Sequence, residues 1–344
     1  MMRDFLRRFG IVVILIPALG LLLLLSDNPF TTPPGPPATA ERAIVALGDS
    51  TMSGEGAGDY TPITNGQADN WCHRSPAAMI DQITAPDVPH LINLACSGAG
   101  TDRITLNTTT KGVEPQQTRQ LGEVAKRFRV TAVLVAIGAN DDPQFGGLIN
   151  QCVQAILHPS DPGCGKQVDP QWPGRVNAMV PKVVRALHDI RKVMSDSGYS
   201  VTAYTLVLQS YAAPVAPNVV RNLQNLNGCP FRSDDLHWVQ DRAVPLLDAG
   251  MRSAAEQAGV RFLDLAKAGT GHEACSGSSE WFTRLTVNWN DFQDNARYNH
   301  ALQSSFHPNA KGYTAFAGCM SKFLATDQKS AACVPDGKGG LRLG

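Results

Sequence analysis

The chain has 344 residues, and its 30 basic and 30 acidic side chains give a formal net charge of zero at pH 7. This balance argues against a nucleic-acid-binding protein, which needs an excess of cations facing the phosphates, and a 43% hydrophobic content argues against a disordered chain. Eight cysteines without a CxxC pair argue against a zinc ribbon or a thioredoxin-like site and are typical of an oxidising compartment.

The N-terminal segment predicts export. Three arginines among the first eight residues precede an uncharged apolar run, Phe9–Leu25, and this order is typical of a signal peptide or a signal anchor. Ala38-Thr39-Ala40 offers a cleavage site, but it lies far beyond the apolar run. The run itself is at the short limit for a membrane span. We therefore expect residues 1–25 to be either a cleaved signal or a retained anchor, so that the protein is secreted or held at the cell membrane.

Proline and glycine mark the limits of the folded domain. Residues 26–40 contain five prolines. Proline lacks an amide donor and favours extended polyproline II, so this segment predicts a stiff linker. The folded domain is expected to span residues 41–333, and the glycine-rich residues 334–344 are expected to form a flexible tail.

Short apolar runs alternate with longer amphipathic stretches along this domain. The short runs predict buried strands at 43–47, 90–94, 132–137, 201–208 and 261–264. The longer stretches predict helices at 76–84, 115–128, 142–157, 176–197, 236–258 and 309–325. Alternating strands and helices indicate an α/β fold with a parallel sheet, right-handed crossovers and helices on both faces.

Functional groups in such a sheet collect at the carboxyl ends of the strands. The first three strand ends and the start of the last helix carry, in chain order, Ser50, Gly98, Asn140 and His307. Taken singly, each residue has a structural explanation as a helix cap, a turn residue or a surface histidine. Taken together, they supply the nucleophile, the base and the oxyanion donors that acyl transfer needs.

Other catalytic motifs are missing from the sequence. It has no G-x-S-x-G elbow, Walker loop, HExxH helix or EF-hand loop. We therefore expect neither a cofactor nor a metal ion.

The four residues at the strand ends resemble the ordered sequence blocks of the SGNH (GDSL) hydrolase family. Gly48-Asp49-Ser50 is similar to the first block and Gly98 to the second. Gly138-Ala139-Asn140-Asp141 is similar to the third block and His307-Pro308 to the fourth. Four blocks in the family order are a far more specific signal than an isolated GDS tripeptide.

Three further segments look like the secreted actinobacterial esterase/lipase branch of this family. They are the glycine-rich run from Gly48 to Gly58, Cys72-His-Arg-Ser75 and Ser305-Phe-His-Pro-Asn309. The resemblance covers about Ala43 to Ala325.

The resemblance implies a three-layer α/β/α sandwich with a five-stranded sheet and an exported serine esterase or lipase. Ser50 would be the nucleophile and His307 the general base. The oxyanion donors would be the backbone amides of Ser50 and Gly98 and the side chain of Asn140. Two alternatives are an O-acyl esterase acting on cell-wall carbohydrate and a catalytically inactive envelope binding protein on the same fold. The protein is expected to be a monomer. Its expected partner is a small-molecule or lipid ester as substrate.

One position departs from the family pattern. Much of the family has an aspartate three residues before the catalytic histidine, but this position is Ser304 here. Some members of the actinobacterial branch use a main-chain carbonyl instead, so the backbone oxygen of Ser304 is expected to orient His307. Asp234 and His237 have the same D-x-x-H spacing and are the less favoured catalytic pair.

The cysteines are similar to those of the same branch, which typically has three local disulfides in series. This resemblance implies pairing of neighbours along the chain, with an additional C-terminal bridge: Cys72–Cys96, Cys152–Cys164, Cys229–Cys275 and Cys319–Cys333.

Overall fold

The computed structural model describes residues 35–106, 113–277, 279–286 and 302–344. The expected signal or anchor at 1–25 and the first part of the expected linker lie outside these ranges. Within them, no helix has the length and apolar character needed to cross a membrane.

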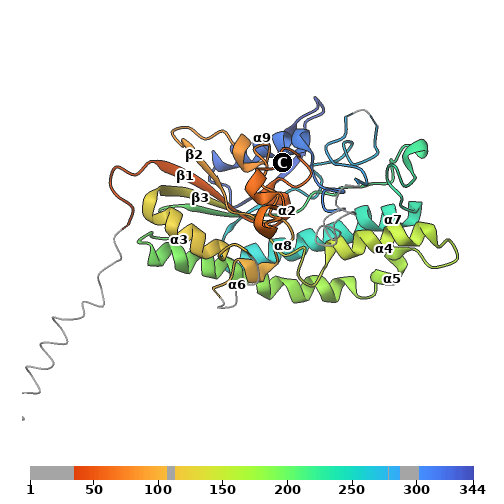
Figure 1. Cartoon of the computed structure of the whole chain (residues 1–344), viewed down its shortest axis with the longest axis horizontal. Coiled ribbons are helices and arrows are strands. Elements are labelled where there is room, and N and C mark those ends of the chain that lie inside the picture. The colour runs from red at the N-terminus through yellow and green to blue at the C-terminus, as the bar shows by residue number, and fades with distance from the viewer. Residues whose placement is uncertain (1–34, 107–112, 278, 287–301) are drawn as a thin grey trace, which may run out of the picture. The chain divides into compact units, whose positions relative to one another are not determined.

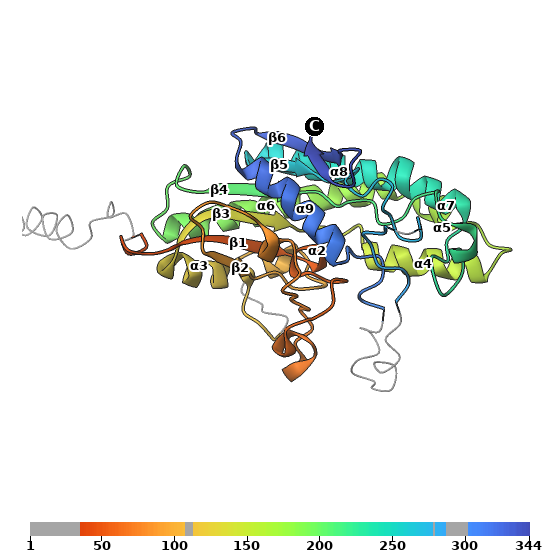
Figure 2. The ribbon, with the colours of Figure 1, turned by 90° about the horizontal axis from the view of Figure 1, so that it is seen from above.

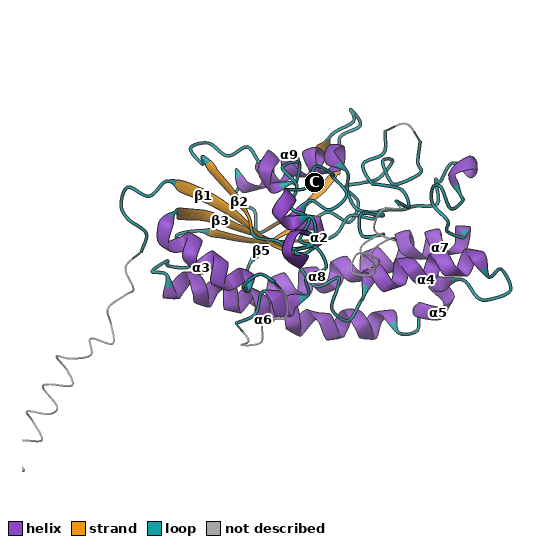
Figure 3. Cartoon of the chain, in the orientation of Figure 1, coloured by secondary structure: helices purple, strands orange, loops and turns teal. Residues whose placement is uncertain are grey.

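A sheet, drawn in orange in Figure 3, forms the centre of the described residues. It has seven strands in the order β2-β1-β3-β4-β5-β6-β7. Strands β1 to β6 are parallel, and β7 pairs antiparallel with β6. The strands are β1 (Arg42–Gly48), β2 (His90–Asn93), β3 (Arg129–Ala136), β4 (Thr205–Gln209), β5 (Arg261–Asp264), β6 (Ser330–Pro335) and β7 (Leu341–Leu343).

Helices cover both faces of this sheet. Helix α6 packs against both α3 and α8 along one face, and α9 lies over the other face (Figure 1). The helices are α2 (Ser50–Ser53), α3 (Gln117–Arg127), α4 (Phe145–Leu157), α5 (Cys164–Val168), α6 (Trp172–Asp196), α7 (Ser233–Trp238), α8 (Val244–Ala258) and α9 (Ala310–Leu324). The three-layer α/β/α sandwich is therefore confirmed.

The expected number of five strands is wrong, and so is the flexible tail at 334–344. Residues 330–343 form a β6–β7 hairpin that extends the sheet beyond β5. The Cys319–Cys333 disulfide ties β6 to α9, and Asp336 accepts hydrogen bonds from the backbone of Lys338 and Gly340 in the connecting turn. The glycines thus belong to a tight turn rather than to a frayed end.

Two element boundaries also differ from the prediction. The helix expected at 76–84 is only a 3₁₀ turn, Ile80–Gln82. The strand expected from residue 201 begins at Thr205, because Val201 lies in an exposed turn.

The strand order changes direction at β1, and this change indicates where a ligand site is expected. The chain leaves β1 for β2 on one side and later returns to β3 on the other, and this switch point is where open α/β sheets bind ligands. The carboxyl ends of β1 and β3 meet closely there, since a Cβ on Gly48 would lie 2.0 Å from the carbonyl oxygen of Ala136. Gly48 also has a φ of +142°, so only glycine fits this position.

All four disulfides pair as expected from the resemblance. Cys72–Cys96 holds the loop that leads to Gly98. Cys152–Cys164 joins α4 to α5. No cysteine is left free.

Candidate active site

Ser50 begins the short helix α2 directly after β1. Asp49 caps this helix, because its carboxylate accepts from the backbone N–H of Thr51 at 3.1 Å and from the Thr51 hydroxyl at 2.7 Å. Gly54 ends α2 in the left-handed conformation. The Ser50 hydroxyl is thereby held at the carboxyl end of β1, where its half-buried side chain lines a cavity.

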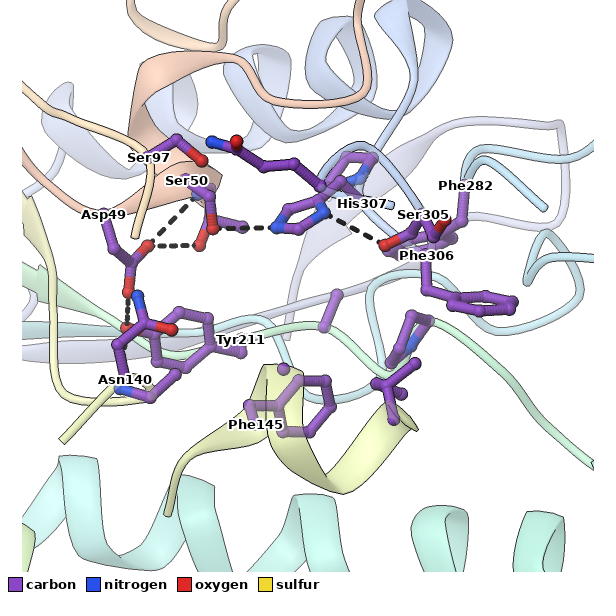
Figure 4. Close-up of a pocket in the computed structure, with 18 of the residues that line it drawn as sticks. Asp49, Ser50, Ser97, Asn140, Phe145, Tyr211, Phe282, Ser305, Phe306 and His307 are labelled. Carbon is purple, nitrogen blue, oxygen red and sulfur yellow. Dashed lines mark hydrogen bonds between the residues drawn. The ribbon is translucent and has the colours of Figure 1, made fainter. Parts of the chain in front are cut away.

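Asp49 also connects the first strand end to the third. The Tyr211 hydroxyl donates to Asp49 (Figure 4), and it accepts from the backbone N–H of Ala139 at 3.4 Å. Burial raises the pKa of Asp49 to about 6, although hydrogen bonds from Tyr211 and Thr51 oppose this shift. Sequence reasoning missed Tyr211, and its only signal was its place just after β4.

The structure brings Ser50 and His307 together across 257 residues of sequence. The Ser50 hydroxyl lies 2.7 Å from Nε2 of His307, and Nδ1 of His307 donates to a backbone carbonyl at 3.1 Å (Figure 4). The bond at Nδ1 leaves Nε2 as the unprotonated nitrogen that accepts from Ser50. This is the geometry of a serine nucleophile beside its base.

The carbonyl that orients His307 belongs to Ser305, so the expectation for Ser304 is wrong. Ser304 is turned away, because its oxygen accepts from the Thr283 hydroxyl at 2.6 Å. Phe306 has a φ of +59°, which bends the chain so that the carbonyl two residues before His307 reaches Nδ1. A backbone carbonyl therefore stands where a carboxylate would orient the histidine, but it belongs to Ser305 and not to Ser304.

Burial lowers the pKa of His307 below its ordinary value of 6.5. The charge of Glu55 and the hydrogen bond to Ser305 act in the opposite direction. The imidazole is therefore neutral at physiological pH, as a general base must be.

Gly98 and Asn140 line the same cavity as Ser50. Within the described residues, the backbone N–H groups of Ser50 and Gly98 have no protein acceptor. Nδ2 of Asn140 donates one hydrogen to the carbonyl of Ala99 at 3.0 Å and has a second hydrogen to offer. Three donors therefore border the space beside the Ser50 hydroxyl.

The loops that carry these donors are tied together. The Asp141 carboxylate accepts from the backbone N–H and the hydroxyl of Thr101, so the loop after β3 holds the loop after β2. In the described ranges, no three His, Cys, Asp or Glu side chains gather as metal ligands would.

The alternative pair, Asp234 and His237, lies away from the cavity. The side chain of His237 is 62% exposed and is 3.5 Å from Asp241, one turn along the same helical segment. The neighbouring Asp235 caps α5 by accepting from the backbone N–H of Gly165. The D-x-x-H spacing here therefore belongs to two exposed residues on the surface of α7.

A cavity of about 470 Å³ opens beside Ser50 and His307. Its volume falls in the range of about 300–1,000 Å³ typical of small-molecule sites. Phe145, which Figure 4 shows, lines it from α4. Ile149 and Val153 line it from the same helix, and much of the remaining lining is also apolar. An apolar chain attached to a polar reacting group fits such a cavity.

Comparison with known proteins gives matches over most of the chain. Residues 46–315 match the sequence model of the GDSL-like lipase/acylhydrolase family. Lipase 2 of Streptomyces coelicolor is 26% identical over 294 residues, which cover 84% of this chain and 88% of that protein.

Solved structures share the fold. The phospholipase A1 of Streptomyces albidoflavus aligns with a TM-score of 0.57 and 23% identity, over 84% of this chain and 100% of that one. An extracellular lipase from Streptomyces rimosus aligns with a TM-score of 0.51 and 20% identity, over 83% of this chain and 100% of that one.

Proposed function

The chain belongs to the GDSL-like lipase/acylhydrolase family, and we propose that it is an exported serine esterase or lipase that cleaves carboxylic esters of apolar acyl chains. The observation that carries this proposal is the 2.7 Å contact between the Ser50 hydroxyl and Nε2 of His307. The apolar cavity beside this contact supports an acyl chain as the substrate group.

The proposed reaction has two halves. The Ser50 oxygen attacks the acyl carbon while its proton passes to Nε2 of His307, and the resulting oxyanion accepts from Ser50, Gly98 and Asn140. The C–O bond to the alcohol then breaks, and the alcohol leaves with the proton from His307. In the second half, water attacks the acyl carbon while its proton passes to Nε2 of His307. The bond between the acyl carbon and the Ser50 oxygen then breaks, Ser50 regains the proton from His307, and the free acid departs.

The substrate class separates this proposal from its alternatives. An O-acetyl group on a carbohydrate needs little apolar volume, whereas the α4 side of the cavity offers a long apolar wall. A purely binding protein would need no nucleophile beside a base.

Hydrolysis of p-nitrophenyl esters from acetate to palmitate tests the proposal, together with labelling by a fluorophosphonate. We expect labelling of one serine and a kcat/KM that rises with chain length beyond acetate. Preference for acetate would favour the carbohydrate O-acyl esterase, and failure to label or hydrolyse would favour the binding protein.

The pH dependence of kcat/KM should reflect the lowered pKa of His307. Because the base must be neutral, kcat/KM should rise with pH through a midpoint below 6.5 and then level off. A pH series with a soluble p-nitrophenyl ester measures this midpoint. Burial raises the pKa of Asp49 to about 6, so Asp49→Asn is the control and should keep the midpoint of the pH profile in place. A midpoint above 6.5 would contradict the assignment.

Chain-length preference should depend on Ile149. Ile149→Trp fills part of the α4 wall with a larger ring. It should lower kcat/KM for octanoate at least about tenfold, since pocket fit to apolar groups is worth about 10–200-fold, while leaving acetate hydrolysis nearly unchanged. The ratio of the two kcat/KM values is the measurement.

Leu157→Trp is the matched control for this change. Leu157 also lies on α4, but it is 48% exposed and does not line the cavity. Its variant should keep the wild-type ratio. An Ile149→Trp enzyme that hydrolyses octanoate and acetate in the wild-type ratio would mean that the acyl chain binds elsewhere.

Export is supported by the four disulfides, which persist in oxidising compartments. The arginines and the apolar run at the N-terminus support the same location. Cleavage or retention of residues 1–25 would be read from the N-terminal sequence of the mature protein.

A further inference from the structure

A buried acid lies next to the candidate active site and has no part in the proposed reaction. Glu55 follows α2, and its side chain is 0% exposed. Its carboxylate accepts from the Tyr60 hydroxyl at 2.8 Å and lies 2.7 Å from Nδ1 of His73. The rings of Tyr60 and His73 stack in parallel with their centres 4.3 Å apart. A buried carboxylate needs such partners.

Backbone contacts hold this cluster close to Cβ of His307. The N–H of Glu55 donates to the carbonyl of Ser50 at 3.1 Å, and the Tyr313 hydroxyl of α9 donates to the carbonyl of Glu55 at 2.8 Å. Gly56 packs directly on the histidine, because a Cβ there would lie 2.8 Å from Cβ of His307. Figure 2 shows α9 beginning close to α2, which brings these segments together.

His307 needs a negative charge that its direct contacts do not supply. When Nε2 takes the proton of Ser50, the ring becomes an imidazolium in a desolvated place. Among the described residues, Nδ1 is bonded to the carbonyl of Ser305, and no carboxylate contacts the ring. A carbonyl dipole compensates a full positive charge only in part. In surroundings of low dielectric, a carboxylate acts beyond contact distance.

The charges around His307 favour Glu55 as the source of this compensation. Burial raises the pKa of Glu55, but the hydrogen bond and charge of His73, the charge of His307 and a hydrogen bond from Ser97 together outweigh it, so the pKa of Glu55 lies below its ordinary value. Glu55 raises the pKa of His307, and His73 lowers it with a smaller effect. Among the titratable side chains of the described residues, these two have the largest effects on the pKa of His307.

We propose that Glu55 is a positioning residue whose buried carboxylate, held by Tyr60 and His73, stabilises the His307 imidazolium across a gap and so replaces the acid of a catalytic triad. The proposal rests on the function proposed above, in which His307 is the base. This role explains why an acid is buried near His307 although no carboxylate contacts the imidazole ring.

Glu55→Gln tests this role, since it removes the charge and keeps the size and hydrogen-bonding capacity of the side chain. We expect kcat to fall about tenfold with KM within about twofold, because one screened charge is worth on the order of one pKa unit, a tenfold effect. The acid limb of kcat/KM should move down by about one pH unit for the same reason. A purely structural role would not move that limb.

Two matched variants complete the test. Tyr60→Phe removes one hydrogen bond to Glu55 and leaves the charge, so kcat and the acid limb should change clearly less than in Glu55→Gln. Glu55→Asp restores the charge and should return the limb toward the wild-type midpoint. An unchanged limb in Glu55→Gln, or equal damage in Tyr60→Phe, would overturn the proposal.

Folding is checked by circular dichroism and thermal melting. If Glu55→Gln does not fold, the double variant Glu55→Gln/His73→Gln keeps an amide pair in the cluster and removes the carboxylate. Its limb should still fall, because the effect of Glu55 on His307 exceeds that of His73. A limb at the wild-type midpoint would again overturn the proposal.

Failure of this inference differs from failure of the proposed function. A wild-type pH profile in Glu55→Gln beside an inactive Ser50→Ala would overturn only the role of Glu55. An active Ser50→Ala would overturn the proposed function itself.

Discussion

Replacement of Ser50 by alanine is expected to abolish ester hydrolysis and fluorophosphonate labelling. The hydroxyl is the group that Nε2 of His307 reaches at 2.7 Å, and alanine offers no nucleophile. Loss of the nucleophile in a serine protease costs about 10⁶-fold in kcat, so residual activity should be near the background rate. Hydrolysis of a p-nitrophenyl ester and mass spectrometry of the labelled protein measure the two effects.

The fold should survive this change. The Ser50 hydroxyl makes one hydrogen bond to a side chain, and the backbone of α2 is capped by Asp49 and Gly54 instead. The melting temperature should therefore stay close to wild type. Ser53→Ala is the control, because Ser53 lies in the same short helix without lining the cavity. If Ser50→Ala kept more than a few percent of kcat while Ser53→Ala lost it, the nucleophile would lie elsewhere.

The central strands could be predicted from sequence because burial on both faces makes them continuous apolar runs. Ala43–Leu47 and Ala132–Ala136 are buried throughout, as expected. The β6–β7 hairpin could not be predicted in this way. Strand β7 has only three residues, and β6 is fully buried only at Ala331 and Cys333, so neither strand forms a continuous apolar run.

The candidate site was predictable where motif residues follow strand ends. Ser50, Gly98, Asn140 and His307 line one cavity, although they are spread over most of the chain. The carbonyl at Ser305 was not predictable, because it depends on the positive φ of Phe306. Backbone oxygens are present at every residue, so residue types do not show which one faces a histidine.

The contacts that Asp49 and Glu55 make next to the site could not be predicted from the sequence either. Tyr211 reaches Asp49 from 162 residues away, and Glu55 meets His73 from 18 residues away. Tyr211 carries no motif that links it to Ser50. Glu55 and His73 lie in segments that resemble the actinobacterial branch, but a resemblance does not indicate which side chains pair.

His307→Ala should reduce kcat about as strongly as Ser50→Ala, with little change in KM. Without the imidazole, the proton of Ser50 has no acceptor, and the leaving alcohol has no donor. The expected loss is on the order of 10⁴–10⁶-fold, as for groups that act as one catalytic unit. Steady-state kinetics on a soluble p-nitrophenyl ester measure it.

His237→Ala is the control for the rival pair, and its exposed side chain predicts nearly wild-type kinetics. Ser304→Ala should also keep most of the activity, because the carbonyl of Ser305 orients the ring and the substitution leaves every backbone oxygen in place. A severe loss in His237→Ala with a mild one in His307→Ala would assign the base to the other histidine.

The double variant Ser50→Ala/His307→Ala distinguishes a dyad from two independent contributions. If Ser50 and His307 act only through the shared proton, removal of one makes the other useless. The double variant should then be no slower than either single variant, so that the two losses in transition-state free energy do not add. Additive losses would mean that His307 contributes something that does not pass through the Ser50 hydroxyl. The 2.7 Å contact and the bond from Nδ1 to Ser305 both favour the non-additive result, since they orient one lone pair of the imidazole at a single hydroxyl.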